Sequence, residues 1–369
     1  MSDALSPYPA ILISSYGGPR GPEDVLPFMR NATAGRPVPD ERLIEVSRHY
    51  QLFGGRSPIN EQNEALRRAL AAELARRGCP REVVVGNRNW TPFLADTVAG
   101  LRDQGHRRVA VLTTSAYSSY SSCRQYHEDL EQAMRQVPEV RLDKLGPYWH
   151  QDGFLTANTD ALVAAVTSLR DQVGQQPIRV LFVTHSIPTA MNDLSGGGRP
   201  ENRYQAQHLQ VAAEVVRRAQ LRLGEQLDWE LCYCSRSGPP QVPWLEPDIN
   251  DRIADLNAVV GLVAAPIGFI SDHMEVAYDL DTQARDSAAA AGLAFVRAAT
   301  AGTHPAFVSA LADLLEEQAA VARGEIRGPQ HPCFDPSSGC CRATAAGRPH
   351  EHQPSPTQKE NDVSPPDAR

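Results

Sequence analysis

Short runs of β-branched and aliphatic residues alternate along this chain with longer stretches of helical periodicity. A helical pattern runs over 60–77, where Leu66, Leu70 and Leu74 recur at a spacing of four. Parallel strands need a crossover connection, usually a helix, so the alternation predicts an α/β fold with parallel sheets covered by helices on both faces. The predicted strands are 10–15, 82–86, 108–114, 140–145, 178–185, 228–232, 258–265 and 294–298.

The 369 residues suffice for about two domains. A break near residues 150–153 divides the predicted strands four and four, so we expect two similar lobes, 1–152 and 153–303, with a cleft between them. A last helical pattern and a cysteine-rich extension cover 304–341, which we expect to pack back on the first lobe. Residues 342–369 are almost free of large apolar side chains, and this composition predicts a disordered tail.

Charge and hydropathy exclude several classes of protein. The net charge is −8, from 36 Lys and Arg against 44 Asp and Glu, and it is spread along the chain, so no nucleic-acid-binding surface is expected. The longest apolar stretch, 258–270, is too short for a membrane span and is interrupted by Gly and Pro. No secretory signal precedes residue 10, and we expect a soluble cytoplasmic protein.

A histidine ends one of the apolar predicted strands. His185 stands at the carboxyl end of 178–185, where open parallel sheets place their ligands. An imidazole can exchange protons near neutral pH. The alternative is a structural histidine that is satisfied by hydrogen bonds at a strand end.

Two carboxylates follow the predicted strand 258–265. Ser271 or Asp272 is expected to cap a helix that carries Glu275 and Asp279 on one face, at i and i+4. Two such carboxylates repel unless a cation, a proton or an arginine lies between them. They would also suit the first turn of any helix through its dipole.

Three polar segments complete the candidate site. The glycine-rich loop 53–60 could bind an anion at the start of the next helix. The proline-rich stretch 235–247 is too irregular for a helix or strand and could line a site. Hydroxyl and aromatic side chains gather in 116–126, just beyond a predicted strand.

Taken together, these segments resemble the ferrochelatase family over roughly residues 8–330. Six motifs occur in family order: Tyr-Gly-Gly-Pro, Phe-Gly-Gly-Arg-Ser-Pro, Ser-Cys-Arg-Gln-Tyr, Thr-His-Ser-Ile-Pro, Ser-Arg-Ser-Gly-Pro-Pro-Gln-Val-Pro-Trp-Leu-Glu-Pro and Pro-Ile-Gly-Phe-Ile-Ser-Asp-His-Met-Glu. The resemblance implies two Rossmann-like lobes with parallel four-stranded sheets. It also implies a porphyrin in the cleft, into which ferrous iron is inserted without a nucleotide or a redox change.

The resemblance assigns the catalytic residues. His185 matches the active-site histidine of the family, expected to accept pyrrole protons and to bind the incoming iron. Glu275 matches its carboxylate partner, which would deliver iron or carry protons away, and Asp279 extends the acidic line. Nitrogen and oxygen ligands of this kind suit ferrous iron.

The substrate-binding residues follow in the same way. Ser57 and Tyr126 match positions that contact porphyrin propionates, and Tyr16 matches a residue that approaches the iron from the opposite face. The family also uses an arginine where this chain has Thr33. Either Arg30 or Arg36 could replace it.

The cysteines indicate a metal site near the end of the chain. Three of the seven, Cys333, Cys340 and Cys341, form a C-x6-C-C pattern, one thiolate short of a [2Fe–2S] ligand set. Cys123 matches a cysteine of cluster-containing bacterial ferrochelatases, so the resemblance implies a [2Fe–2S] cluster on these four residues. Its expected role is structural, tying the end of the chain to the first lobe.

Alternatives to that cluster remain open. Four thiolates suit zinc equally well. The pair Cys232 and Cys234 is a rival source of the fourth ligand, although these two and Cys79 are expected to be structural or incidental thiols.

The resemblance implies a metal-inserting lyase of haem biosynthesis that converts coproporphyrin III into Fe-coproporphyrin III. The absence of a hydrophobic membrane-binding lip favours this substrate with four propionates. The alternatives are a chelatase for protoporphyrin IX or sirohydrochlorin, and a non-catalytic haem- or iron-binding redox sensor. A monomer is expected, with transient contacts to other enzymes of the haem pathway.

Overall fold

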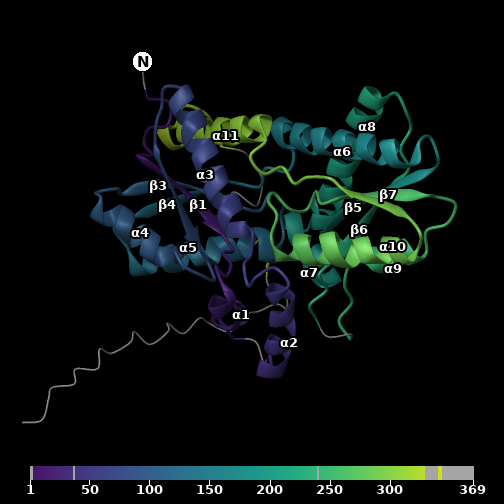
Figure 1. Ribbon diagram of the computed structural model, residues 1–369. Helices are drawn as coiled ribbons and strands as arrows, with labels where there is room; N and C mark the ends of the chain where they lie inside the picture. The colour runs from purple at the N-terminus through teal and green to yellow at the C-terminus, as the bar shows by residue number, and fades with distance from the viewer. Residues whose placement is uncertain (1–2, 36–37, 239–240, 329–339, 343–369) are drawn as a thin grey trace, which may run out of the picture.

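The framework of the chain is a pair of parallel sheets. In the computed structural model, which describes residues 3–35, 38–238, 241–328 and 340–342, each sheet contains four strands (Figure 1). The first has the order β2-β1-β3-β4 and the second the order β6-β5-β7-β8, so both halves share one topology. The strands are β1 (Ala10–Ser15), β2 (Glu82–Asn87), β3 (Arg108–Thr113), β4 (Arg141–Lys144), β5 (Ile178–His185), β6 (Trp229–Cys234), β7 (Gly261–Ala265) and β8 (Ala294–Arg297).

Helices cover both faces of each sheet, as Figure 1 shows. The helices are α1 (Val25–Ala32), α2 (Asp40–Gln51), α3 (Ile59–Arg76), α4 (Leu94–Asp103), α5 (Gln125–Gln136), α6 (Asp152–Val173), α7 (Thr189–Asp193), α8 (Tyr204–Leu223), α9 (Ile249–Ala254), α10 (Arg285–Ala290) and α11 (Pro305–Arg323). Two π-helical segments, η2 (Tyr120–Arg124) and η5 (Glu275–Ala284), and three short 3-10 turns, η1 (Pro22–Asp24), η3 (Ser195–Gly198) and η4 (Pro200–Asn202), complete the described elements.

The alternation of side chains along the central strands explains the layers. In β5, Val180 and Phe182 join a large core that α3, α6, α8 and α11 share across both halves. Leu181 and Val183 point the other way, into a smaller core with α9, η5 and α10. Because successive strand residues face opposite sides of a sheet, a strand buried on both faces reads as a continuous apolar run.

Helix α11 lies against elements of both halves. It packs on α6 and on α3, and Arg77 at the end of α3 donates to Asp313 at 2.6 Å and to Glu316 at 3.0 Å. Gly153 in α6 permits this packing, since a Cβ there would lie 2.1 Å from the carbonyl oxygen of Ala306 in α11.

The predicted α/β class is confirmed, and all eight predicted strands are present. The largest boundary differences are in β6, which extends to Cys234, and in β7, which begins at Gly261 rather than at residue 258. Ala258 has a φ of 61°, a left-handed conformation that cannot continue a strand. The predicted tail lies outside the described residues, except for Arg342.

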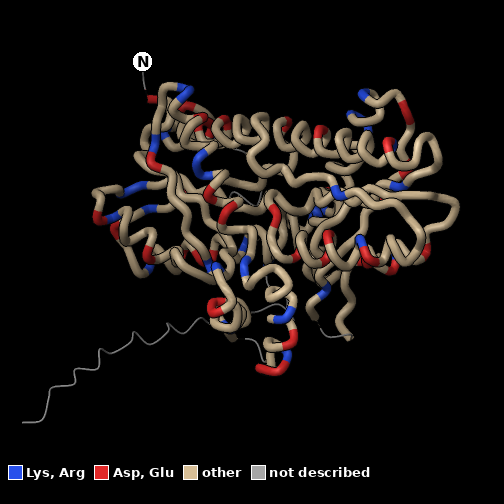
Figure 2. The backbone as a smooth tube through the Cα atoms, viewed as in Figure 1, with Lys and Arg blue, Asp and Glu red and all other residues tan. Residues whose placement is uncertain are grey.

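Acidic and basic residues are interspersed along the described chain, as the colours of the backbone in Figure 2 show. Many of them form arginine–carboxylate pairs, such as Arg170 with Glu225 at 2.9 Å. Within the described ranges, no helix combines the length and the apolar character that crossing a bilayer requires.

The Gly153 contact predicts the effect of a single methyl group. Gly153→Ala should lower the free energy of unfolding by about 1–3 kcal/mol, because the helices must separate to admit Cβ. Gly100→Ala is the matched control, since that exposed helical glycine has open space around it and alanine should stabilise the helix by up to about 1 kcal/mol. Thermal unfolding measures both, and an equal melting temperature for the two variants would contradict the proposed packing constraint.

Candidate active site

His185 and Glu275 meet at the carboxyl edge of the second sheet. His185 is the last residue of the central strand β5, and Glu275 is the first residue of η5, which follows the neighbouring strand β7. The imidazole Nε2 lies 3.4 Å from the carboxylate Oε1. The two side chains keep 30% and 42% of their surface exposed, so the pair can be reached from outside.

The pair is charged at neutral pH. Burial favours the neutral imidazole, but the charge and hydrogen bond of Glu275, with help from the Ser186 carbonyl and Asp279, outweigh it and raise the pKa of His185 to about 9. Burial likewise opposes the carboxylate, but His185 lowers the pKa of Glu275 to about 2. Since Nδ1 donates to the Ser186 carbonyl, Nε2 is the nitrogen that faces the carboxylate.

Asp279 extends the acidic line along η5. Burial raises the pKa of Asp279 to about 7, with a further contribution from the charge of Glu275, although a hydrogen bond from Ser235 opposes the shift. Ser235 reaches it from the end of β6 with a φ of 60°, an uncommon conformation for a residue other than glycine. Asp279 can therefore exchange protons near neutral pH.

The predicted helix cap at Ser271 or Asp272 is wrong. The helical segment begins at Met274, and the side chain that caps it is His273, whose Nδ1 accepts from the backbone N–H of Glu275 at 3.2 Å. Asp272 instead accepts hydrogen bonds from Arg297 and Thr300, both at 3.0 Å, because the guanidinium at the end of β8 binds this carboxylate. The segment that carries Glu275 and Asp279 is π-helical, a rare form that is frequent at functional sites.

A tyrosine from the first half of the chain interacts with the carboxylates of Glu275 and Asp279. Tyr50, at the end of α2, is partly buried, and its pKa is raised by burial and then by Tyr16, Glu275 and Asp279. The ring of Phe28 packs edge-on against both Tyr16 and Tyr50, with ring centroids 6.1 Å apart in each case. Tyr16, predicted from its motif, thus lies in one group with the carboxylates, while Tyr50 belongs to no motif singled out in the sequence.

Helix α2 also touches η5 directly. The ring of His49 stacks on that of Tyr278, with centroids 3.9 Å apart and planes inclined by 14°. Another histidine, His273, stands two residues before Glu275, and burial lowers its pKa. Neither His49 nor Tyr278 carries a signal in the sequence that separates it from ordinary helix residues.

The predicted propionate ligands, Ser57 and Tyr126, lie in the first half. Ser57 precedes α3 and is largely buried, as is Tyr126 in α5. The Arg88 guanidinium lies 4.2 Å from the Tyr126 ring centroid, and its buried Nη2 has no hydrogen-bond partner among the described residues. Arg30 is paired with Asp40 at 2.9 Å, while Arg36 lies outside the described residues.

Two of the predicted cluster ligands form a close pair. The sulfur atoms of Cys340 and Cys341 are 3.4 Å apart and buried, and Cys341 has a φ of 54°. Cys123 is buried in η2, where the ammonium of Lys144 donates to its sulfur at 3.7 Å. Cys333 lies outside the described residues, and among the described ones no three metal-binding side chains are grouped together.

The rival cysteines occupy the core. Cys232 and Cys234 belong to the cluster packed between β6, α9 and η5. Burial raises the pKa of the Cys232 thiol to about 12 and that of Cys234 well above its usual range. Such thiols behave as small apolar side chains.

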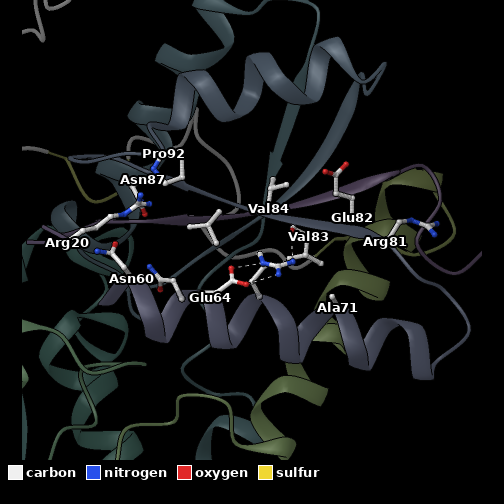
Figure 3. Close-up of a pocket in the computed structure, with 13 residues that line it drawn as sticks. Arg20, Asn60, Glu64, Ala71, Arg81, Glu82, Val83, Val84, Asn87 and Pro92 are labelled. Atoms are coloured by element: carbon white, nitrogen blue, oxygen red, sulfur yellow. Dashed lines mark hydrogen bonds and ion pairs between the residues drawn. The ribbon is translucent and has the colours of Figure 1, made fainter. Parts of the chain in front are cut away.

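A pocket of about 600 Å³ lies elsewhere, between the edge strand β2 and helix α3 (Figure 3). Its charged lining includes Arg67, which forms a two-pronged ion pair with Glu64. It contains none of the predicted site residues. Because the exposed His185–Glu275 pair and Asp279, whose pKa values are shifted by one another, lie at the carboxyl edge of the second sheet, that edge and not this pocket is the candidate site.

The fold and site define a two-sheet α/β protein with a histidine–carboxylate centre. The family model described as Ferrochelatase matches residues 8–319. The chain therefore belongs to the ferrochelatase family.

Named relatives cover most of the chain. This chain is 46% identical to a Coproporphyrin III ferrochelatase of Streptomyces griseus, over 92% of this chain and 95% of that protein. It is 47% identical to one of Leifsonia xyli over 84% of each. Among solved structures, the sirohydrochlorin chelatase SirB of Bacillus subtilis in complex with cobalt matches with a TM-score of 0.48 and 11% identity, over 86% of this chain and 97% of that chain.

The interaction between the charges of His185 and Glu275 predicts how the pKa of His185 changes when the carboxylate is replaced. Glu275→Gln should bring the pKa of His185 from about 9 to below its ordinary value of 6.5, because burial then acts with less opposition. NMR titration of the imidazole measures this change. Glu246→Gln, at an exposed carboxylate, is the control and should leave the titration unchanged.

The same coupling sets a pH window for stability. The raised pKa of His185 stabilises the fold fully below about pH 6.5 and loses this effect as the pH rises through about 9. The lowered pKa of Glu275 stabilises the fold above about pH 4.5, and this stabilisation is lost as the pH falls towards 2.

For the Glu275→Gln variant, an unchanged pKa of His185 would show that the two side chains are not coupled.

Proposed function

We propose that this protein inserts ferrous iron into coproporphyrin III and releases Fe-coproporphyrin III, as a metal-inserting lyase of haem biosynthesis. The observation that carries the proposal is the His185–Glu275 contact of 3.4 Å, with Asp279 farther along the same helical segment. The substrate is inferred from the relatives in Streptomyces and Leifsonia, which are named for coproporphyrin III.

The reaction exchanges protons for a metal. The porphyrin loses two pyrrole N–H protons and gains one ferrous ion, so no electron is transferred. His185 must be neutral at Nε2 to accept such a proton, and in the ligand-free pair it is protonated. A dication that binds beside Glu275 lowers the pKa of His185 by charge repulsion, so the arrival of iron prepares the base.

Protons then need a path away from His185. Glu275 lies in direct contact, but its pKa of about 2 makes it a poor proton store. Asp279, with a pKa of about 7, can take up and release protons at neutral pH. We assign the relay to Asp279 and the binding of the iron cation to Glu275 together with His185.

Recognition of the macrocycle is assigned to the first half of the chain. Ser57 and Tyr126 would bind propionates, and Tyr16 would approach the iron from the face opposite His185. Arg88 is a further candidate, because its guanidinium adjoins Tyr126 and retains a buried nitrogen without a partner among the described residues. A guanidinium is well suited to carboxylate binding.

His185→Ala should lower the rate of ferrous iron insertion by about 10²- to 10⁴-fold, because the base is removed. Coproporphyrin binding, measured by fluorescence quenching, should change little. His106→Ala is the control, because His106 forms a separate pair with Glu82 at 3.1 Å. This variant should insert iron at the wild-type rate.

Substrate choice is tested by steady-state insertion into coproporphyrin III, protoporphyrin IX and sirohydrochlorin. Fastest turnover with coproporphyrin III supports the proposal, and faster turnover with another tetrapyrrole assigns the chain to that substrate. Absence of turnover with all three would leave the haem- or iron-binding sensor. Substantial turnover in His185→Ala would remove the assigned base.

We also propose a [2Fe–2S] cluster on Cys123, Cys333, Cys340 and Cys341. The close, buried sulfur pair of Cys340 and Cys341 supports it, because the two sulfur atoms lie 3.4 Å apart on the same side of a chain turn in which Cys341 has a φ of 54°. The cluster would supply a covalent tie between the end of the chain and η2. Zinc on the same thiolates is the alternative.

Cys340→Ser should lower cluster content and melting temperature together, because one ligand of the tie is lost. Cys79→Ser, outside the proposed ligand set, is the control and should keep the cluster. Iron and acid-labile sulfide in equal amounts, with visible absorption that dithionite bleaches, support the cluster. A colourless protein that contains zinc would overturn it.

The larger organisation is part of the proposal. We assign residues 1–152 and 153–303 to the two lobes and 304–341 to the extension that packs on the first lobe. We further propose that the protein acts in the cytoplasm as a monomer with transient partners from the haem pathway.

A further inference from the structure

A buried polar cluster lies directly behind His185. Thr184 precedes His185 on β5, and its hydroxyl lies 2.6 Å from the Tyr204 hydroxyl and 2.9 Å from His208 Nε2. Tyr204 and His208 stand one turn apart on α8. The exposed fractions of Thr184 and His208 are 0%, and that of Tyr204 is 5%.

The hydrogen bonds of this cluster run in one direction. His208 Nδ1 lies 2.7 Å from the Tyr204 carbonyl, which can only accept, so Nδ1 carries a proton. Burial lowers the pKa of His208 to about 3, and the neutral ring therefore accepts at Nε2 from Thr184. Thr184 then accepts from the Tyr204 hydroxyl, whose single proton is shared between the Thr184 oxygen at 2.6 Å and the carbonyl oxygen of His185 at 3.1 Å.

The same cluster holds the loop that leads to Glu275. The ring of Tyr117 stacks on His208 with centroids 3.6 Å apart, and its hydroxyl donates to the Ile267 carbonyl at 2.9 Å. A Cβ on the next residue, Gly268, would lie 2.1 Å from the Thr184 hydroxyl. The end of β5 and the loop between β7 and η5 are thus packed on the same few atoms.

We propose that Thr184, Tyr204 and His208 are positioning residues that set the distance and orientation of His185 relative to Glu275. This role in catalysis rests on the proposed iron insertion, whereas the positioning itself does not. Buried polar groups cost free energy that an apolar set of the same shape would avoid. In this cluster the polar groups fix one hydrogen-bond arrangement at the main chain of His185, which an apolar set could not do.

The test uses substitutions that preserve shape. Tyr204→Phe and Thr184→Val each remove one hydroxyl, and Thr184→Ser retains it. Tyr233→Phe is the matched control, because Tyr233 is equally buried, pairs with Thr184 in the sheet and bonds to Gln205 at 2.8 Å, outside the cluster.

We expect Tyr204→Phe and Thr184→Val to lower kcat by about 10- to 100-fold, with KM for the porphyrin little changed. The pKa of His185, measured by NMR in the absence of substrate, should fall in both variants, because the contact with Glu275 loosens. Thr184→Ser should restore both values. Tyr233→Phe should lower only the melting temperature.

Two outcomes separate this proposal from the proposed function. If Tyr204→Phe and Thr184→Val lower the melting temperature as Tyr233→Phe does, but leave the His185 titration and kcat unchanged, the cluster is only structural. If the wild-type chain inserts no iron, the proposed function fails, while the His185 titration still decides whether the cluster positions the pair. If one variant does not fold, the other one decides.

Discussion

The contact between the His185 imidazole and the Glu275 carboxylate joins two segments that the sheet brings to one edge. Each group changes the ionisation of the other, since His185 lowers the pKa of Glu275 to about 2 and Glu275 raises that of His185 to about 9. Such coupling requires a fixed short distance. Parallel order in the second sheet supplies it, because β5 and β7 are neighbours and both end at this edge.

An ion pair of this kind is a natural receptor for a divalent cation. The pKa of about 2 keeps the Glu275 carboxylate charged at neutral pH, whereas burial raises the pKa of Asp279 to about 7. One π-helical segment therefore carries two carboxylates that differ in ionisation, and the proposed function gives them separate tasks, cation binding for Glu275 and proton exchange for Asp279.

Sequence patterns predicted the framework, and together with the family resemblance they singled out His185 and Glu275, which the structure brings into contact, but not every neighbour of that pair. Apolar strands buried on both faces leave a strong signal; His185 ends one of them, and Glu275 begins the helical segment that follows another. Tyr50 and His49 reach the site from α2 in the other half, a long-range contact that no local pattern records. The helix cap at Asp272 was mispredicted because Arg297, distant in sequence, binds that carboxylate.

The close approach of Gly268 to Thr184 restricts which residues can stand at position 268. With only 2.1 Å between the Thr184 hydroxyl and the place of a Cβ at residue 268, the two positions share one volume. The Cβ and the backbone Cα of Thr184 would also lie only 2.5 and 2.7 Å from that atom, so loss of the Thr184 side chain alone would not make room for it. Any side chain at residue 268 would therefore displace the end of β5, the strand that terminates in His185.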